Sequence, residues 1–174
     1  MNTVRKGYIR PVDFKHGRVD MTHGSGGRAM AQLIEELFLA AFDNDWLRAA
    51  NDNACFAVQS GRMVMATDSH VVSPLFFPGG DIGCLSVHGT VNDVAMSGAK
   101  PLYLSASFIL EEGFPLADLK RIVDSMAQAT REAILRAATK VFAKQGFAGG
   151  RVEQISKAAK SHDRMIYYYF GSKE

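Results

Sequence analysis

The chain of 174 residues is poor in cysteine, tryptophan and proline, and it has no long hydrophobic run. Its two cysteines, Cys55 and Cys84, are too few for a disulfide framework or a metal knuckle, so we expect both to be small core residues. No stretch reaches the roughly 20 apolar residues that a membrane span requires, and the N-terminus lacks the apolar segment of a signal peptide. We therefore expect a cytoplasmic protein with no membrane partner.

Charge is unevenly distributed along the chain. Residues 1–129 contain 11 Lys and Arg against 14 Asp and Glu, whereas residues 130–174 contain nine against four. With 47% hydrophobic residues the chain can bury a core, so it is not a disordered polymer. A compact basic tail behind an acidic front indicates an end that faces nucleic acid.

The hydrophobic pattern of the front block predicts helices alternating with strands, which is typical of layered α/β or α+β domains. Apolar residues at helical spacing predict the helices, and Glu35 and Glu36 are expected on the solvent side of the first. Alternating and β-rich stretches predict the strands. The expected helices cover 29–42, 81–97 and 116 onward, and the expected strands cover 54–58, 62–67 and the stretch after Pro101.

A glycine-rich stretch, "HGSGGR" at 23–28, comes directly before the first expected helix. Glycine permits positive φ and lets backbone amides approach an anion closely, and the N-terminus of a helix favours negative charge. The stretch is therefore either a phosphate site or simply a turn at a helix entry. We expect His23 to be a loop or capping residue.

Acidic residues follow in two further places. Asp68 ends an expected apolar strand, where a carboxylate suits Mg²⁺ held against nucleotide phosphates, or else caps the next turn. Asp93, beside Asn92, stands among apolar helix neighbours, so we expect it to have a cation, a donor or water beside it. Asp52 is a third acidic candidate, and the three carboxylates with the glycine-rich stretch form a constellation.

The strings "HGSGGRAM", "ATDSHVVSPLFFPGGDIG" and "GTVNDVAMSGAKPLYLSASFILEEG" resemble the N-terminal domain of the HypE family of hydrogenase maturation proteins, in the aminoimidazole ribonucleotide synthetase superfamily. The resemblance covers about residues 1–129. It implies an α/β domain that pairs with a second copy through its sheet and binds ATP with Mg²⁺. The residues implied around the phosphates are Gly24, Ser25, Gly26 and Gly27, and those around the metal are Asp52, Asp68 and Asp93, with Asn92 close by.

In that family ATP drives dehydration of a carbamoyl group carried on a C-terminal cysteine. This sequence has no cysteine after Cys84. We therefore expect no cyanide-forming activity, and no residue is assigned a catalytic role.

From Thr130 the pattern changes, with Thr130 suited to an N-cap and Gly146 to a helix stop. Short helices are expected in "VEQISKAAK" and "SHDRMIYYYFGSKE", either as a DNA reader or as a three-helix core with its tyrosines packed inward. "AATKVFAKQGF" and "MIYYYFGSKE" resemble the DNA-binding domain of TetR-family repressors, which implies a positioning helix near 152–159 and a recognition helix near 163–169 in the major groove of double-stranded DNA. The residues implied at the DNA are Arg151, Arg164, Met165, Tyr167, Tyr168 and Lys173.

We therefore predict an α+β chain. It would comprise a partial aminoimidazole ribonucleotide synthetase-like α/β domain at 1–129 and an all-α, three-helix helix-turn-helix unit at 130–174. The two would meet near 127–131 inside one helix over 116–145. The expected function is DNA binding in transcription regulation, with a homodimer formed through the HypE-like part. The alternatives are an ATP-binding hydrogenase maturation fragment that acts with other maturation proteins, and a non-functional fusion.

Overall fold

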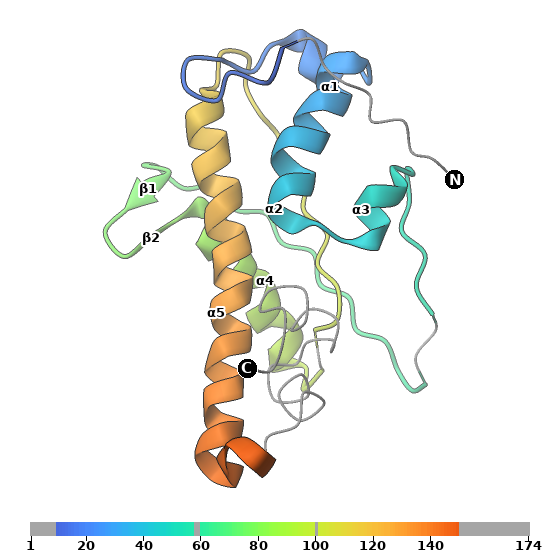
Figure 1. The fold of residues 1–174 in the computed structure, drawn as a ribbon, viewed down its shortest axis with the longest axis vertical. Helices are drawn as coiled ribbons and strands as arrows, with labels where there is room; N and C mark the ends of the chain where they lie inside the picture. Colours follow the sequence, from blue (N-terminus) through green and yellow to red (C-terminus); the bar gives the residue numbers. More distant parts are fainter. Residues whose placement is uncertain (1–9, 58–59, 100, 150–174) are drawn as a thin grey trace. The chain divides into compact units, whose positions relative to one another are not determined.

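The computed structural model describes residues 10–57, 60–99 and 101–149, with the backbone alone over 133–149 (Figure 1). The chain divides into two compact units. The first comprises Met1–Val58 and Phe108–Asp124, and the second comprises Gln59–Ser107 and Ser125–Glu174. The described elements are helices and one two-stranded sheet.

The first long helix changes its winding midway. It begins as α1 (Arg28–Leu33), continues as the π-helical segment η2 (Ile34–Leu39) and ends as α2 (Ala40–Phe42). The helix predicted over 29–42 is therefore confirmed. Leu33 and Leu37, one turn apart, are both 2% exposed, as their spacing predicts.

Of the two glutamates predicted on the solvent side, Glu35 is exposed, whereas Glu36 is only partly exposed because both of its carboxylate oxygens accept hydrogen bonds. Glu36 Oε2 accepts a hydrogen bond from the Val12 N–H at 2.7 Å, and Oε1 accepts one from Gln32 Nε2 at 2.8 Å. Gln32 Nε2 also donates to the Arg10 carbonyl oxygen at 2.7 Å. The helix thereby holds the backbone of residues 10–12 along its side.

Two short helices flank the long one. The 3-10 turn η1 (Met21–Gly24) precedes it, and α3 (Asp45–Ala49) follows it. Asn44 caps α3 by accepting a hydrogen bond from the Leu47 N–H at 2.9 Å, as an N-cap amide does.

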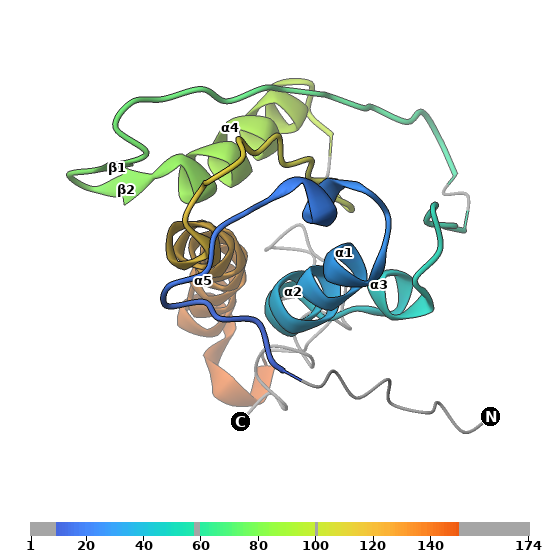
Figure 2. The same ribbon diagram turned by 90° about the horizontal axis from the view of Figure 1, so that it is seen from above.

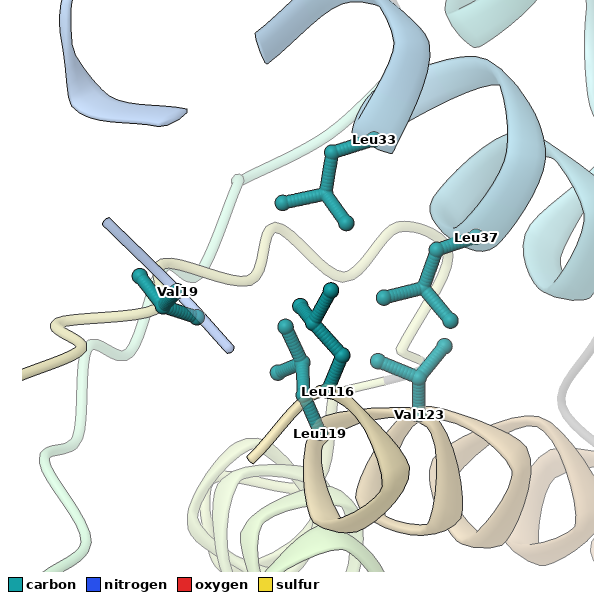
Figure 3. Packing of buried hydrophobic residues seen from close by; sticks show 6 residues of the cluster. All are labelled: Val19, Leu33, Leu37, Leu116, Leu119 and Val123. Atoms are coloured by element: carbon teal, nitrogen blue, oxygen red, sulfur yellow. The ribbon is translucent and has the colours of Figure 1, made fainter. Parts of the chain in front are cut away.

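The core of the first unit forms where α5 (Leu116–Gly149) begins. Side chains from α5 lie against side chains from the first helix and from the segment before η1 (Figure 3). Leu119 and Val123 are 0% exposed. The six residues of this cluster are Val19, Leu33, Leu37, Leu116, Leu119 and Val123. Ile122 and Met126 are buried as well, so the buried residues of α5 recur at the helical spacing that predicts this helix.

Helix α5 passes through the predicted join at 127–131 without a break. The helix predicted over 116–145 is confirmed, although it continues beyond the expected stop at Gly146. Thr130 does not cap a helix; its hydroxyl donates to the Met126 carbonyl oxygen at 3.3 Å, the bond that a threonine makes inside a helix. Neither α5 nor any other helix of the described residues combines the length and apolarity needed to cross a bilayer.

The second unit contains a small hairpin that leads directly into a helix (Figure 2). Strand β1 (Phe76–Phe77) pairs antiparallel with β2 (Gly80–Asp81) across a Pro78-Gly79 turn, and Gly79 has φ +92. Helix α4 (Ile82–Met96) starts at once, because the Asp81 side chain accepts the Cys84 N–H at 3.0 Å. The helix predicted over 81–97 is confirmed.

The strands predicted over 54–58, 62–67 and after Pro101 are wrong for the described residues. These stretches are irregular there and pair with no neighbouring strand. A strand needs a partner for its backbone N–H and C=O groups, and composition alone does not supply one. Large apolar side chains on these stretches are consequently exposed, with Met65 89% and Ile109 99% accessible.

Gly17 lies where the chain crosses the start of α5, and it provides a test of this packing. Its N–H donates to the Asp13 carbonyl oxygen at 2.8 Å, and its own carbonyl oxygen accepts the Leu116 N–H at 3.0 Å. A Cβ at this position would lie 2.3 Å from the Asp13 carbonyl oxygen and 2.9 Å from Leu116 Cδ1. We expect Gly17→Ala to lower the free energy of unfolding by about 1–3 kcal/mol, the usual effect of overpacking, in urea denaturation.

The matched control is Gly24→Ala, because a Cβ there would meet nothing within 4 Å. Equal effects of the two substitutions would contradict the tight contact at Gly17.

Candidate functional site

The glycine-rich stretch begins with a closed capping arrangement at η1. The Asp20 carboxylate accepts the Thr22 N–H at 2.8 Å, and the Asp20 N–H donates to His23 Nδ1 at 3.1 Å. The Asp20 side chain also accepts from the His23 backbone N–H, which together with the bond to His23 Nδ1 closes a capping box around the first turn. The prediction that His23 is a capping residue is confirmed.

The glycines beyond this box lie in an open loop. Gly26 has φ +71, the left-handed conformation that glycine adopts freely, so the predicted need for glycine is confirmed at this position. A Cβ at Gly24 or Gly26 would meet nothing within 4 Å, and at Gly27 it would meet only Ser25 Oγ. Gly27 is the N-cap residue of α1 and offers no side chain to the N–H groups of the first turn. The role of this loop at phosphates stays a prediction.

Asp68 forms a pair with His70, and the pair lies against α4. His70 Nε2 is 3.2 Å from Asp68 Oδ2, and Asp68 Oδ1 accepts the Ser69 N–H at 2.8 Å. The His70 side chain is 14% exposed and that of Asp68 is 39% exposed. Asp68 lies in an irregular stretch and keeps part of its carboxylate in solvent, so its predicted roles, as a cap of the next turn or at a metal, both stay predictions.

The pair packs against the backbone of α4 at Gly89, where the absence of a side chain leaves room for the His70 ring. A Cβ built on Gly89 would lie 2.6 Å from His70 Nε2 and 3.6 Å from Asp68 Oδ2. Glycine inside a helix is about 1 kcal/mol less favourable than alanine, so α4 gives up helix stability at the point where the imidazole approaches. Sequence reasoning did not single out His70 or Gly89; the Asp-x-His spacing was the available signal.

Asn92 and Asp93 follow Gly89 by three and four residues, so they continue the same face of α4 by one turn. Both are exposed, so the burial on which the expected cation, donor or water beside Asp93 was argued is absent. Exposure removes the desolvation penalty that a buried carboxylate would carry.

Asp52 is exposed and lies in the first unit, in an irregular stretch after α3. That stretch is held by an edge-on contact between Trp46 and Phe56, with centroids 5.3 Å apart, and by a hydrogen bond from Trp46 Nε1 to the Cys55 carbonyl oxygen at 2.8 Å. Cys55 is exposed and Cys84 is partly exposed, so the prediction that both cysteines are core residues is wrong.

The donor chemistry suits magnesium, although the described residues form no complete cage for it. Among the described residues, no group of three or more His, Cys, Asp or Glu side chains gathers to hold a metal ion. Mg²⁺ nevertheless commonly uses one or two carboxylates together with substrate phosphates and water. Asp68 and Asp93, with the Asn92 amide, fit that pattern in the second unit; the role of all three predicted carboxylates stays a prediction.

The residues implied at DNA lie outside the described part of the chain. They are Arg151, Arg164, Met165, Tyr167, Tyr168 and Lys173. The short helices expected at 152–159 and 163–169 lie there as well, so the helix-turn-helix stays a prediction. The homodimer also stays a prediction.

The chain belongs to the AIR synthase related protein family, whose N-terminal domain model matches residues 50–162. That match runs across the predicted join at 127–131. The resemblance of the front of the chain to this class of domain is therefore confirmed.

Within this family the similarity is to HypE proteins. Carbamoyl dehydratase HypE of Cupriavidus necator is 77% identical over 132 residues, which cover 75% of this chain and 38% of that protein. Carbamoyl dehydratase HypE of Escherichia coli K12 is 52% identical over 120 residues, covering 66% of this chain and 36% of that protein. The chain thus spans little more than a third of the length of these relatives.

A solved structure gives the same result for the fold. The crystal structure of hydrogenase maturation protein HypE in complex with ATP is 57% identical, with a TM-score of 0.61, over 64% of this chain and 33% of that chain. These relatives are not TetR-type proteins, so the predicted fusion of two families gains no support from them and stays a prediction.

The capping box leads to a pH prediction. Hydrogen bonds from the Thr22 hydroxyl and N–H, with His23 nearby, hold the pKa of Asp20 below its ordinary value of 3.8. A carboxylate with a lowered folded-state pKa stabilises the fold above the unfolded-state pKa, and this contribution is lost as pH falls through the folded-state value. We expect thermal unfolding of Asp20→Asn to depend less steeply on pH than that of the parent below about pH 4. Parallel pH profiles of the melting temperature would contradict this.

Proposed function

We propose that this chain is the nucleotide-binding N-terminal domain of a HypE-type hydrogenase maturation protein, and that it binds ATP with Mg²⁺. The observation that carries the proposal is the likeness to the HypE structure solved with ATP, at 57% identity and a TM-score of 0.61. The proposal therefore favours the maturation alternative over DNA binding as the main function.

The loop at Gly24–Gly27 is proposed to lie over the phosphates. Its support is local: Gly26 has positive φ, and no Cβ atoms from Gly24, Gly26 or Gly27 obstruct approach to the backbone. Backbone amides at such a helix entry donate hydrogen bonds to phosphate oxygens. Ser25 keeps its hydroxyl on the Thr22 carbonyl oxygen at 2.9 Å, which ties the loop to η1.

The second unit is proposed to hold the metal. Asp68 and Asp93 would bind Mg²⁺ through carboxylate oxygens, with the Asn92 amide oxygen as a further donor. The ion would neutralise phosphate charge and so favour the approach of a nucleophile to the nucleotide. The Asp68 carboxylate is already oriented before any ion binds, because the Ser69 N–H and the His70 ring fix its direction.

The relatives carry the name carbamoyl dehydratase, and the chain spans little more than a third of their length. For this chain we propose the ATP-binding part of such a reaction, with hydrogenase maturation proteins as its partners.

Nucleotide binding is tested by isothermal titration calorimetry with ATP in the presence and absence of Mg²⁺. We expect the chain to bind ATP, and Asp68→Asn to weaken Mg-dependent binding by about tenfold or more, since losing a contact to a charged group costs at least ~1.5 kcal/mol. The matched control is Asp124→Asn, which removes an exposed carboxylate paired with Lys120 on α5. No heat with ATP at any Mg²⁺ concentration would overturn the proposal.

DNA binding by residues 130–174 is the second candidate, favoured by the excess of nine basic over four acidic residues there. A reading head of this kind binds phosphates through lysine and arginine and reads guanine edges through arginine. A single head would bind weakly, because such proteins use paired half-sites.

A gel shift with double-stranded DNA over a range of salt concentrations tests this candidate. We expect a shift that weakens steeply with salt, and Arg164→Ala to reduce affinity by about tenfold, the contribution of one good arginine contact. Arg62→Ala, at an exposed arginine of the acidic front, should leave the shift unchanged. Absence of a shift at low salt would rule the candidate out.

A further inference from the structure

We propose that His70 is a positioning residue that sets the Asp68 carboxylate for a metal–nucleotide complex, and that Gly89 supplies the space in which it does so. The inference deepens the proposed function, because it rests on Asp68 being a metal ligand there. It concerns residues of one unit only, so it depends on no arrangement between the two units.

The first step is the fixed direction of the carboxylate. The Ser69 N–H donates to Oδ1 at 2.8 Å, and His70 Nε2 lies 3.2 Å from Oδ2. Within the described part of the chain each oxygen has one such neighbour, so a further lone pair on each can point at a cation. A carboxylate held in this way loses less rotational freedom on binding than a free one.

The second step is the burial of the imidazole. The His70 side chain is 14% exposed although its residue lies in an irregular stretch, because its ring sits on the backbone of α4 at Gly89. Any larger residue at position 89 would place a Cβ 2.6 Å from Nε2. The ring, being the far end of a side chain, would have to move, and Asp68 would lose its partner.

The third step is the presence of further oxygen donors on the face of α4 against which this pair lies. Asn92 and Asp93 follow Gly89 on the same face of α4 and are exposed. The pair thus places Asp68 within one turn of two further oxygen donors. Partners of ligating carboxylates commonly change metal affinity by about 10–100-fold when they are removed.

The competing explanation is that His70 merely fills space against α4. Filling space predicts lower stability on substitution and no specific change in metal affinity. Positioning predicts a change in metal affinity that follows the hydrogen-bonding atom rather than the volume of the side chain.

The test uses Mn²⁺ as the probe, with ATP and the full chain, and measures bound Mn²⁺ by electron paramagnetic resonance. We expect His70→Ala to weaken Mn²⁺ binding by about tenfold or more. His70→Gln should restore much of the affinity, because its side-chain amide can donate from a similar place. His88→Ala, at an exposed histidine beside Gly89 on α4, is the matched control and should bind as the parent does.

Gly89→Ala separates positioning from folding. Alanine favours the helix, so thermal stability should stay level or rise, while Mn²⁺ affinity should fall as it does in His70→Ala. In the double variant His70→Ala, Gly89→Ala, the second change should add nothing, because the ring it displaces is already gone.

The outcomes separate the two ideas. A parent chain that binds no Mn²⁺ with ATP overturns both the nucleotide site and this inference. A parent that binds Mn²⁺, together with unchanged affinity in His70→Ala or in Gly89→Ala, overturns the inference alone. Additive losses in the double variant would also overturn it, because Gly89 would then act independently of the ring.

Discussion

The first unit depends on one apolar contact, in which Leu33 and Leu37 of the first helix meet Leu116, Leu119 and Val123 of α5. Removing these side chains from water is the main source of stability available to the unit, because burial of apolar surface is the dominant favourable term in folding. The directed interactions then form around it. Glu36 holds the segment before η1, and the backbone of residues 17–19 runs beside that of 113–116 through hydrogen bonds such as Val19 N–H to the Phe114 carbonyl oxygen at 2.8 Å.

The helices of this chain could be predicted from the sequence, whereas its extended stretches could not. Helical spacing is a local property, and the buried face of α5 from Leu116 to Met126 follows from it directly. Strand formation depends on a partner that lies elsewhere in the sequence. The stretches 62–67 and 101–110 carry a β-rich pattern and still pair with no strand among the described residues.

At the candidate site, likewise, the local features could be predicted from the sequence and the features that depend on packing could not. The cap at His23 and the positive φ at Gly26 follow from short-range rules of helix entry. The exposure of Asp93 and the partnership of Asp68 with His70 do not, because each depends on which face of α4 meets another segment. A glycine in a helix gives no sign in the sequence of whether a ring will rest on it, and only the packed structure shows that one does.

The continuity of helix α5 fixes the rotation of its later residues about the helix axis relative to its first turns. Because the predicted join at 127–131 lies inside an uninterrupted helix of 34 residues, there is no loop there to absorb a change in length. Each residue of an α-helix turns the chain by about 100° and advances it by about 1.5 Å. Inserting or deleting a single residue near Thr130 would therefore rotate the following residues of α5, up to Gly149, by about 100° about the helix axis, while leaving the buried face from Leu116 to Val123 in register. The number of residues across the join, and not only their identity, therefore determines which face of α5 each later residue of the helix occupies.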